Sequence, residues 1–276
     1  MNKNIIFGGS GLVGLSLREL LRNKKDYLYY SKNNKKFKKF NLDKDIKKFP
    51  FKKINTCFFF ASPRIKKKNF FNNKFVDELN WLKKVVTNIE IKKFIYLSSS
   101  SVYYNKTHII GSVKRKCEKY IIQNKKKFKY YQIWRPFNLI GKSYLNSDHF
   151  HNFLFKIMFI KNNKKFNFSG NLKDKRGYSD VNSFTRVLYS FSNKNISFIK
   201  NYGNKNMIKV SEIIDLYNSK YQKINRNKFI AKFKSKTTSI NSIASKKNNI
   251  YYNKKSILVL KKYLLNSLNE KKVQHM

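Results

Sequence analysis

The chain has 276 residues, of which 41% are hydrophobic and 16% aromatic, so it can bury a large core in one domain or two lobes and is not a disordered protein. Its 62 Lys and Arg against 14 Asp and Glu give a net charge of +48, which favours anionic ligands such as nucleotides. The excess indicates either a polyanionic partner such as nucleic acid or a bias toward A/T-rich codons. Because the lysines are spread along the whole chain, we favour codon bias.

The cysteines and the hydropathy pattern bear on redox chemistry and compartment. Cys57 and Cys117 are too few for a disulfide framework and lack metal-ligand spacing, and the apolar run around Cys57 predicts a buried thiol. Asp148, His149 and His151 cluster in sequence, but residues two apart do not share a helix face, so we expect no metal site. No stretch resembles a membrane span or a signal peptide, and we therefore expect a soluble, cytoplasmic protein.

Strands and helices alternate along the first half of the chain. Apolar runs predict buried strands at 4–7, 27–30, 56–60, 94–97 and 130–134. Apolar residues recur at helical spacing after the first strand, near 70–89 and near 112–124. This alternation predicts an α/β fold with a doubly wound parallel sheet, which binds ligands outside the carboxyl ends of its strands.

The pattern becomes irregular after residue 141, with helices expected near 148–160, 209–218 and 255–267. We expect a core domain over residues 1–141, rejoined by about 177–204. A smaller lobe, built from residues 142–176 and 205–276, would close over the ligand edge of the sheet.

A glycine-rich turn, "GGSGLVG", follows the first predicted strand. Gly8 allows a sharp turn, Gly11 lets backbone approach a pyrophosphate, and Gly14 lets the next helix pack on the sheet. The helix N-terminus adds N–H donors and a favourable dipole for phosphate. The other residues of this predicted cofactor-binding turn are Ser10, Leu12 and Val13. A glycine turn without a ligand is the alternative.

The end of the second predicted strand is where such a fold reads the adenosine ribose. An acidic residue there binds the 2′-hydroxyl of NAD, and a basic one accommodates the 2′-phosphate of NADP. At this position the chain has Ser31 and Lys32. The lysine weakly favours NADP, although a lysine carries little information in so lysine-rich a chain. The expected cofactor is therefore NAD or NADP.

Six segments in one order complete the pattern, namely "GGSGLVG", "FFFASP", "FIYLSSSSVY", "GSVKRKCE", "WRPFNLIG" and "RGYSDV". Over roughly residues 1–215 the chain thus resembles the NAD-dependent epimerase/dehydratase family, the extended short-chain dehydrogenase/reductases. The resemblance implies a Rossmann core, a bound nicotinamide dinucleotide and a nucleotide-sugar substrate held by a C-terminal substrate lobe. It also implies a homodimer through a four-helix seam, which the lysine-rich helices make doubtful.

The resemblance further implies a catalytic Ser, Tyr and Lys, the last two spaced as YxxxK. Ser99 matches the serine, which would hydrogen-bond the reacting oxygen, and Lys114 matches the lysine, which would bind the nicotinamide ribose. The position of the phenol is Ile110, which has no proton to give or take. Loss of a general acid/base costs about 10²–10⁴ in rate, or roughly 3–5 kcal/mol of barrier.

Three hypotheses follow from the missing phenol. The first, which we favour, is an enzyme in which Tyr104, His108, or Ser99 with water supplies the proton. The second is a sensor or scaffold that binds the dinucleotide without turnover, and the third is a decayed copy. A gain of turnover in Ile110→Tyr would indicate that the rest of the site is intact.

The resemblance assigns further residues to the cofactor and the substrate. Ala61 and Pro136 would contact the cofactor, with Pro136 and Phe137 beside the nicotinamide ring. Asn138 would face the substrate, and Arg176 would contact a substrate phosphate.

Other positions either have two interpretations or depart from the family pattern. Asp180 would lock the junction of the lobes or form a structural ion pair. Asn41 and Leu42 stand where the family often has Asp-Leu or Asp-Ile beside adenine. Phe75 stands near a cofactor-contacting Asn, and Asn182 and the serine after it follow where a second Asp is expected.

Overall fold

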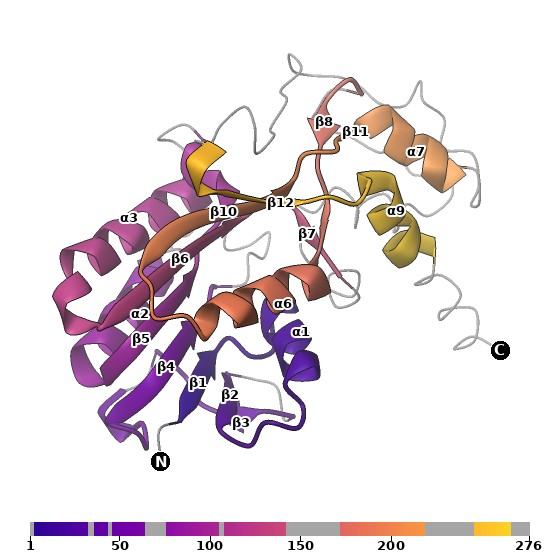
Figure 1. Ribbon diagram of the computed structural model, residues 1–276. Coiled ribbons are helices and arrows are strands. Elements are labelled where there is room, and N and C mark those ends of the chain that lie inside the picture. Colours follow the sequence, from indigo (N-terminus) through magenta and orange to yellow (C-terminus); the bar gives the residue numbers. More distant parts are fainter. Residues whose placement is uncertain are drawn as a thin grey trace. The chain divides into compact units, whose positions relative to one another are not determined.

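The structure, a computed structural model, describes residues 3–32, 36–43, 46–63, 76–104, 108–141, 172–218 and 246–265 (Figure 1). It divides into two compact units. Unit 1 is Met1–Pro136 with Val181–Asn201, and unit 2 is Phe137–Asp180 with Tyr202–Met276. The sequence places these boundaries near 141, 177 and 204.

Strands and helices alternate in unit 1, as predicted. Its strands are β1 (Asn4–Phe7), β2 (Tyr27–Ser31), β3 (Lys38–Lys39), β4 (Lys53–Phe59), β5 (Glu90–Leu97), β6 (Tyr130–Pro136) and the start of β10 (Phe198–Asn204). Its helices are α1 (Leu12–Leu20), α2 (Val76–Asn88), α3 (Ile109–Gln123) and α6 (Val181–Ser192). Single 3-10 turns are η1 (Ile46–Lys48), η3 (Ser100–Tyr103) and η4 (Lys125–Lys127).

The large sheet has the strand order β12-β10-β6-β5-β4-β1-β2-β3. The neighbouring strands from β3 through β6 pair in parallel, with Phe7 opposite both Tyr30 and Phe59. The order 3-2-1-4-5-6 within it is that of a doubly wound Rossmann sheet, so the predicted fold class is confirmed. The order reverses between β1 and β4, and in doubly wound folds ligands bind outside the carboxyl ends of the strands at such a point.

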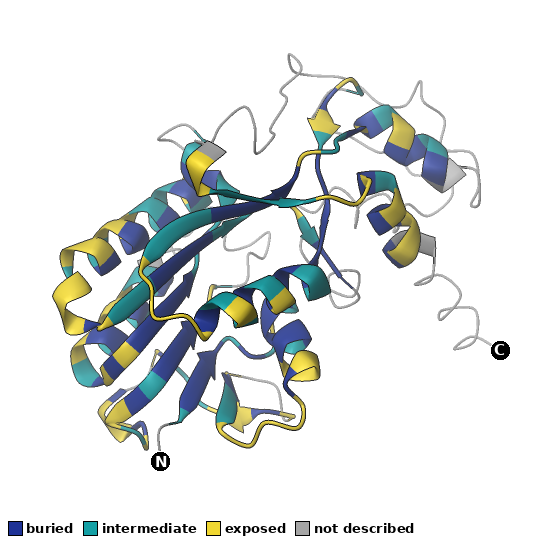
Figure 2. Ribbon diagram, viewed as in Figure 1, coloured by how far each residue is buried: buried dark blue, intermediate teal, exposed yellow. Residues whose placement is uncertain are grey.

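Helices cover both faces of the unit 1 sheet, with α1 and α6 on one side and α2 and α3 on the other (Figure 1). Each helix buries one stripe, as Val13 and Leu17 do on α1. Figure 2 shows the consequence, since the central strands are buried almost throughout while the helices expose their outer sides. Cys57 on β4 is fully buried, which confirms the predicted buried thiol.

Aromatic side chains fill much of the unit 1 core. Phe7, Tyr30 and Phe49 pack with ring centroids 5.1–6.1 Å apart beside β1 and β2. Trp134 on β6 is fully buried and meets Phe198 on β10 edge to face at 5.1 Å. Edge-to-face packing of this kind adds about 0.5–1.5 kcal/mol per pair beyond simple burial.

Unit 2 is described over shorter elements. Its strands are β7 (Leu139–Ile140), β8 (Lys175–Arg176), β9 (Ser179–Asp180), β11 (Ile208–Lys209) and β12 (Asn249–Tyr252). Its helices are α7 (Val210–Asn218), α9 (Ser256–Leu260), the 3-10 turn η6 (Lys246–Asn248) and the π-helical turn η7 (Lys261–Leu265). They enclose a second core around Val210, Ile213 and Leu260. The helix expected near 148–160 lies outside the described residues.

Candidate functional site

The glycine turn lies at the carboxyl end of β1, beside the switch point of the sheet. Gly8 has φ +85°, and a Cβ there would come within 2.6 Å of the Phe60 and Ala61 backbone. A Cβ on Gly14 would meet the carbonyl oxygens of Gly8 and Gly9 at 2.6 Å. The fold itself therefore requires glycine at positions 8 and 14.

Gly11 is different, because the described part of the chain does not require its small size. Among these residues a Cβ there would meet only the Gly8 oxygen, at an ordinary 3.4 Å, and Gly11 is exposed. Gly11 is also the N-cap of α1, so the first-turn N–H groups of Leu12 and Val13 have no partner within the helix. An exposed glycine before free N–H groups fits an anion that approaches the backbone closely.

Two hydroxyl groups connect the turn to the second strand. The Ser10 and Ser31 Oγ atoms lie 2.8 Å apart, and Ser31, the last residue of β2, is buried. The structure thus brings these two predicted residues together. It also places Ala61, at the end of β4, against Gly8.

Lys32 forms an ion pair on the protein itself. Its Nζ lies 2.6 Å from Asp43 Oδ2, and Trp81 Nε1 donates to the other oxygen of Asp43 at 2.6 Å. Partial burial acts to raise the pKa of Asp43, but the hydrogen bonds from Lys32 and Trp81 outweigh it and lower the pKa. The sequence suggested that Lys32 would accommodate a 2′-phosphate. That prediction did not include the Asp43 carboxylate, which lies 11 residues away in sequence and pairs with Lys32.

The two residues expected near adenine are used internally. Leu42 is buried in the core, and Asn41 Oδ1 accepts a hydrogen bond from the Asp43 N–H at 3.1 Å. Asn41 therefore shapes the loop that presents Asp43. Phe75 lies outside the described residues.

The three positions of the expected catalytic trio lie at the start of η3 and on α3, but their side chains form no proton relay. Ser99 is the N-cap of η3, and its Oγ accepts from the Ser101 N–H at 3.2 Å. Ile110 lies in the first turn of α3 and is half-buried. Lys114 is buried, with its Nζ 2.6 Å from Glu78 Oε1 and 2.9 Å from the Leu97 carbonyl oxygen.

Glu78, on α2, is the site residue that the sequence did not reveal. Its carboxylate is almost fully buried and accepts from Tyr96 at 2.7 Å as well as from Lys114. The second oxygen accepts from Ser62 Oγ at 2.7 Å, beside Ala61. One feature of the sequence could have revealed Glu78, namely an acidic residue on the apolar face of a helix, four positions before Leu82.

A second polar network lies one turn further along the buried face of α3. Arg135 binds the Glu118 carboxylate through two nitrogens, at 2.9 and 2.5 Å, and Ser98 donates to the same carboxylate. Arg135 also donates to the Tyr103 hydroxyl at 2.8 Å, which in turn donates to Asn201 Oδ1. These groups are satisfied by one another, so Tyr103 is committed to a structural network.

Tyr104 and His108 meet at the start of α3. Their rings lie edge to face at 4.8 Å, and His108 Nδ1 caps the helix by accepting from the Gly111 N–H at 3.0 Å. Burial, followed by the nearby Arg115 charge, lowers the pKa of His108. The capped imidazole is therefore neutral, with its proton on Nε2, in the form that carries a single donor.

The residues assigned to the substrate lie near the start of unit 2. Asn138 is exposed, adopts φ +39°, and donates to the Gly177 carbonyl oxygen at 3.1 Å. Arg176 on β8 interacts with Tyr178. Burial raises the pKa of Tyr178, and the Arg176 charge offsets part of that rise. Pro136 ends β6, and Phe137 after it is buried.

Asp180 and Asn182 anchor secondary structure. Asp180 is buried in unit 2 and accepts from Lys262 and Tyr263, both at 2.8 Å, as a structural ion pair does. Asn182, in unit 1, accepts from Ser16 Oγ at 2.6 Å. Since Ser16 lies on α1, Asn182 holds the helix that carries the glycine turn.

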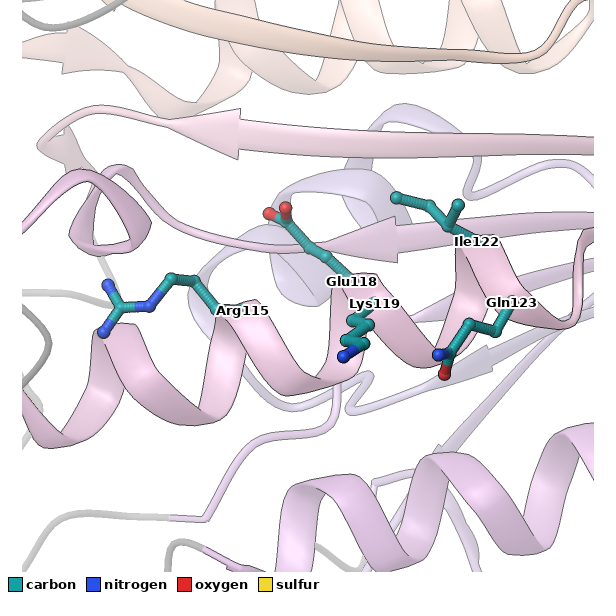
Figure 3. A pocket seen from close by; sticks show the side chains of 5 residues that line it. All are labelled: Arg115, Glu118, Lys119, Ile122 and Gln123. Carbon is teal, nitrogen blue, oxygen red and sulfur yellow. The ribbon is translucent and has the colours of Figure 1, made fainter.

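A shallow pocket lies on the outer side of α3, away from the glycine turn (Figure 3). Its lining residues are Arg115, Glu118, Lys119, Ile122 and Gln123. The figure shows Arg115, Lys119 and Gln123 along one side of the helix, while the Glu118 carboxylate points away from them. Glu118 is engaged by Arg135, so its carboxylate belongs to the buried network described above.

Within the described ranges, no helix is long and apolar enough to cross a membrane. No group of three or more His, Cys, Asp or Glu side chains in the same ranges is arranged to hold a metal ion. Asp148, His149 and His151 lie outside them.

Comparison with known proteins identifies the fold. No family model matches the sequence, and no curated protein matches it. Among solved structures, TunA, an NAD-dependent NDP-hexosamine 5,6-dehydratase, has a TM-score of 0.66 at 14% identity, with 91% of this chain and 93% of that chain covered. The UDP-glucuronic acid 4-epimerase of Bacillus cereus with UDP-glucuronic acid and NAD gives 0.65 at 18%, covering 85% and 88%.

A third similar structure is MoeE5 with UDP-glucuronic acid and NAD, with a TM-score of 0.63 at 12% identity and coverage of 92% and 87%. The structural neighbours are thus NAD-dependent nucleotide-sugar epimerases and dehydratases, as the sequence resemblance predicts. At these identities the likeness establishes the Rossmann-type fold of the chain.

Proposed function

We propose that the chain binds NAD on the Gly8–Gly14 turn. The observation that carries this proposal is the exposed Gly11, where no contact with the described residues requires the absence of a side chain. The free N–H groups of the first turn of α1 would hold the pyrophosphate. Bound NAD supplies a nicotinamide ring that accepts or donates hydride, and the protein supplies binding and orientation.

We further propose a nucleotide sugar as the second ligand. Three similar structures are described with UDP-sugars and NAD, or as acting on an NDP-hexosamine. The net charge of +48 attracts such an anionic ligand. Asn138 and Arg176 are the residues proposed to contact it, and unit 2 is proposed as the substrate lobe.

The geometry favours binding without turnover through the Tyr–Lys route. Position 110 carries an aliphatic side chain, and Lys114 is bound by Glu78 and the Leu97 carbonyl. A chain with this arrangement serves as a dinucleotide-dependent sensor or scaffold. We propose this as the principal function.

A second candidate is an enzyme with a different proton donor. The Tyr104–His108 contact favours it, because a phenol and an imidazole meet at the start of α3, the helix that carries Ile110. Either function begins with the same bound dinucleotide.

The experiment for the shared step is native mass spectrometry of the purified protein, followed by calorimetry with NAD. We expect co-purified or titratable NAD at one per chain. Gly11→Val should abolish this binding, because its side chain would stand where the anion approaches the backbone. The melting temperature should fall only slightly, since the Cβ itself would meet the Gly8 oxygen at an ordinary 3.4 Å. Binding that survives Gly11→Val, or no heat at millimolar NAD, contradicts the proposal.

A further inference from the structure

Asp43 lies beside the end of the second strand, although it follows that strand by 12 positions in sequence. The Phe40 N–H donates to the carbonyl oxygen of Ser31, the last residue of β2, at 3.1 Å. This bond places the loop that carries Asp43 next to Lys32. In a doubly wound fold, the end of the second strand is the adenosine-ribose position.

Two groups bind the carboxylate of Asp43, and two more bind its backbone. Lys32 and Trp81 each bind one of its oxygens at 2.6 Å. Lys84, one turn along α2 from Trp81, donates to the Asp43 carbonyl oxygen at 2.8 Å, and Asn41 binds its N–H. Such a carboxylate is fixed rather than free to rotate away from a ligand.

Both members of the ion pair remain reachable by a ligand. The side chains of Lys32 and Asp43 are 52% and 41% exposed, so the pair is only partly withdrawn from solvent. A 2′-phosphate that approaches Lys32 would meet a negative charge 2.6 Å from its ammonium group. A 2′-hydroxyl would instead find a carboxylate that accepts a hydrogen bond.

We propose that Asp43 makes this site select NAD against NADP, by neutralising Lys32 and by repelling a 2′-phosphate. The inference rests on the proposed NAD binding at the glycine turn. It reverses the lean toward NADP that Lys32 suggests in the sequence. Selection of this kind works by a repulsive element as much as by an attractive one.

The test measures the dissociation constants of NAD and NADP by calorimetry for the wild type and three variants. Asp43→Asn keeps an acceptor for Trp81 but removes the charge, and we expect NADP to bind about tenfold more tightly while NAD changes by less than threefold. The double variant with Asp43→Asn and Lys32→Met should lose that gain, because Lys32 is the group released. Melting curves show whether each variant is folded.

Glu90→Gln is the matched control, since Glu90 is an exposed acid paired with Lys53 at 2.7 Å, at the start of β5 and away from the carboxyl ends of the strands. It should leave both constants unchanged. An unchanged NADP-to-NAD ratio in Asp43→Asn, or a wild type that prefers NADP, overturns the inference while NAD binding stands. A wild type that binds neither ligand contradicts the proposed function and this inference together.

Discussion

The ammonium group of Lys114 lies 2.6 Å from the Glu78 carboxylate, and both side chains are more than 90% buried. The resemblance gives this lysine a role at the nicotinamide ribose, whereas the structure gives it a partner on the neighbouring helix. Tyr96 contributes a hydrogen bond to Glu78, and the Lys114 ammonium lies 5.1 Å from the centre of the Tyr96 ring. Because these partners already satisfy the Lys114 ammonium group, a hydrogen bond to a ligand hydroxyl would add little stabilisation.

The first prediction concerns the stability of this pair. Glu78→Gln and Lys114→Gln should each lower the free energy of unfolding by about 3–5 kcal/mol, because each leaves one buried charge unpaired. The double variant should lose clearly less than the sum. Urea denaturation followed by circular dichroism measures all three values, and additive losses would show that the two groups are not coupled.

The second prediction concerns turnover. Ile110→Tyr alone should give no NAD-dependent reaction with UDP-sugars, because Lys114 is held by Glu78. Adding Glu78→Gln should release Lys114 and raise the rate above that of Ile110→Tyr, with an upper limit of about 10²–10⁴ from general acid/base catalysis. Absorbance at 340 nm reports bound NADH in single-turnover mixtures. Full activity in Ile110→Tyr alone would show that Glu78 does not restrain the lysine.

The third prediction separates two glycines of the same turn. Gly14→Ala should lower the free energy of unfolding by about 1–3 kcal/mol, because its Cβ would collide with two backbone oxygens. Gly11→Ala should cost less, about 0.5 kcal/mol, since its Cβ has room and only the poorer N-cap propensity of Ala counts against it. Thermal melts of the two variants, recorded side by side, measure the difference. Equal losses would contradict the geometry of the turn.

The fourth prediction concerns pH. The pKa of His108 is lowered in the folded protein, so the unfolded chain binds the proton more readily, and stability should fall as the pH drops below about 6.5. Protonation of Nδ1 removes the cap on Gly111, which is worth roughly 1 kcal/mol. His108→Asn retains a capping oxygen that does not titrate. Melting temperatures between pH 7.5 and 5.0 should therefore decline more for the wild type than for this variant.

The fifth prediction addresses the positive charge. Because the lysines are spread over the chain, we expect a 20-base-pair DNA duplex to bind weakly and without a preferred surface. The triple charge reversal of Lys125, Lys126 and Lys127 should weaken binding as much as that of Lys24, Lys25 and Lys48, all six being exposed. Fluorescence anisotropy at 50–300 mM salt measures this. A slope that drops by about 3 in the first variant alone would indicate true phosphate contacts on η4.

The sequence predicts the sheet better than the site, for a physical reason. Buried parallel strands are continuous apolar runs, so β1 and the core of β4 can be predicted from the sequence. In contrast, β3 consists of two lysines, and β10 has a polar sequence that forms a strand only because neighbouring strands pair with it. The glycines of the turn were readable because backbone geometry demands them. The partners of Lys32 and Lys114 were not, because ion pairs form between residues that only the folded chain brings together.

The hydrogen bonds that join Ser16 to Asn182 and Thr185 have a consequence for biosynthesis. The helix that steadies the glycine turn is encoded after the whole 137–180 segment, so a ribosome must extend the nascent chain through that segment before α1 meets its partner. At about 5–20 residues per second, the amino-terminal half waits several seconds with one face of its sheet covered by α1 alone. During that interval a chaperone, or a separately supplied α6 peptide, has access to a surface that the finished protein conceals.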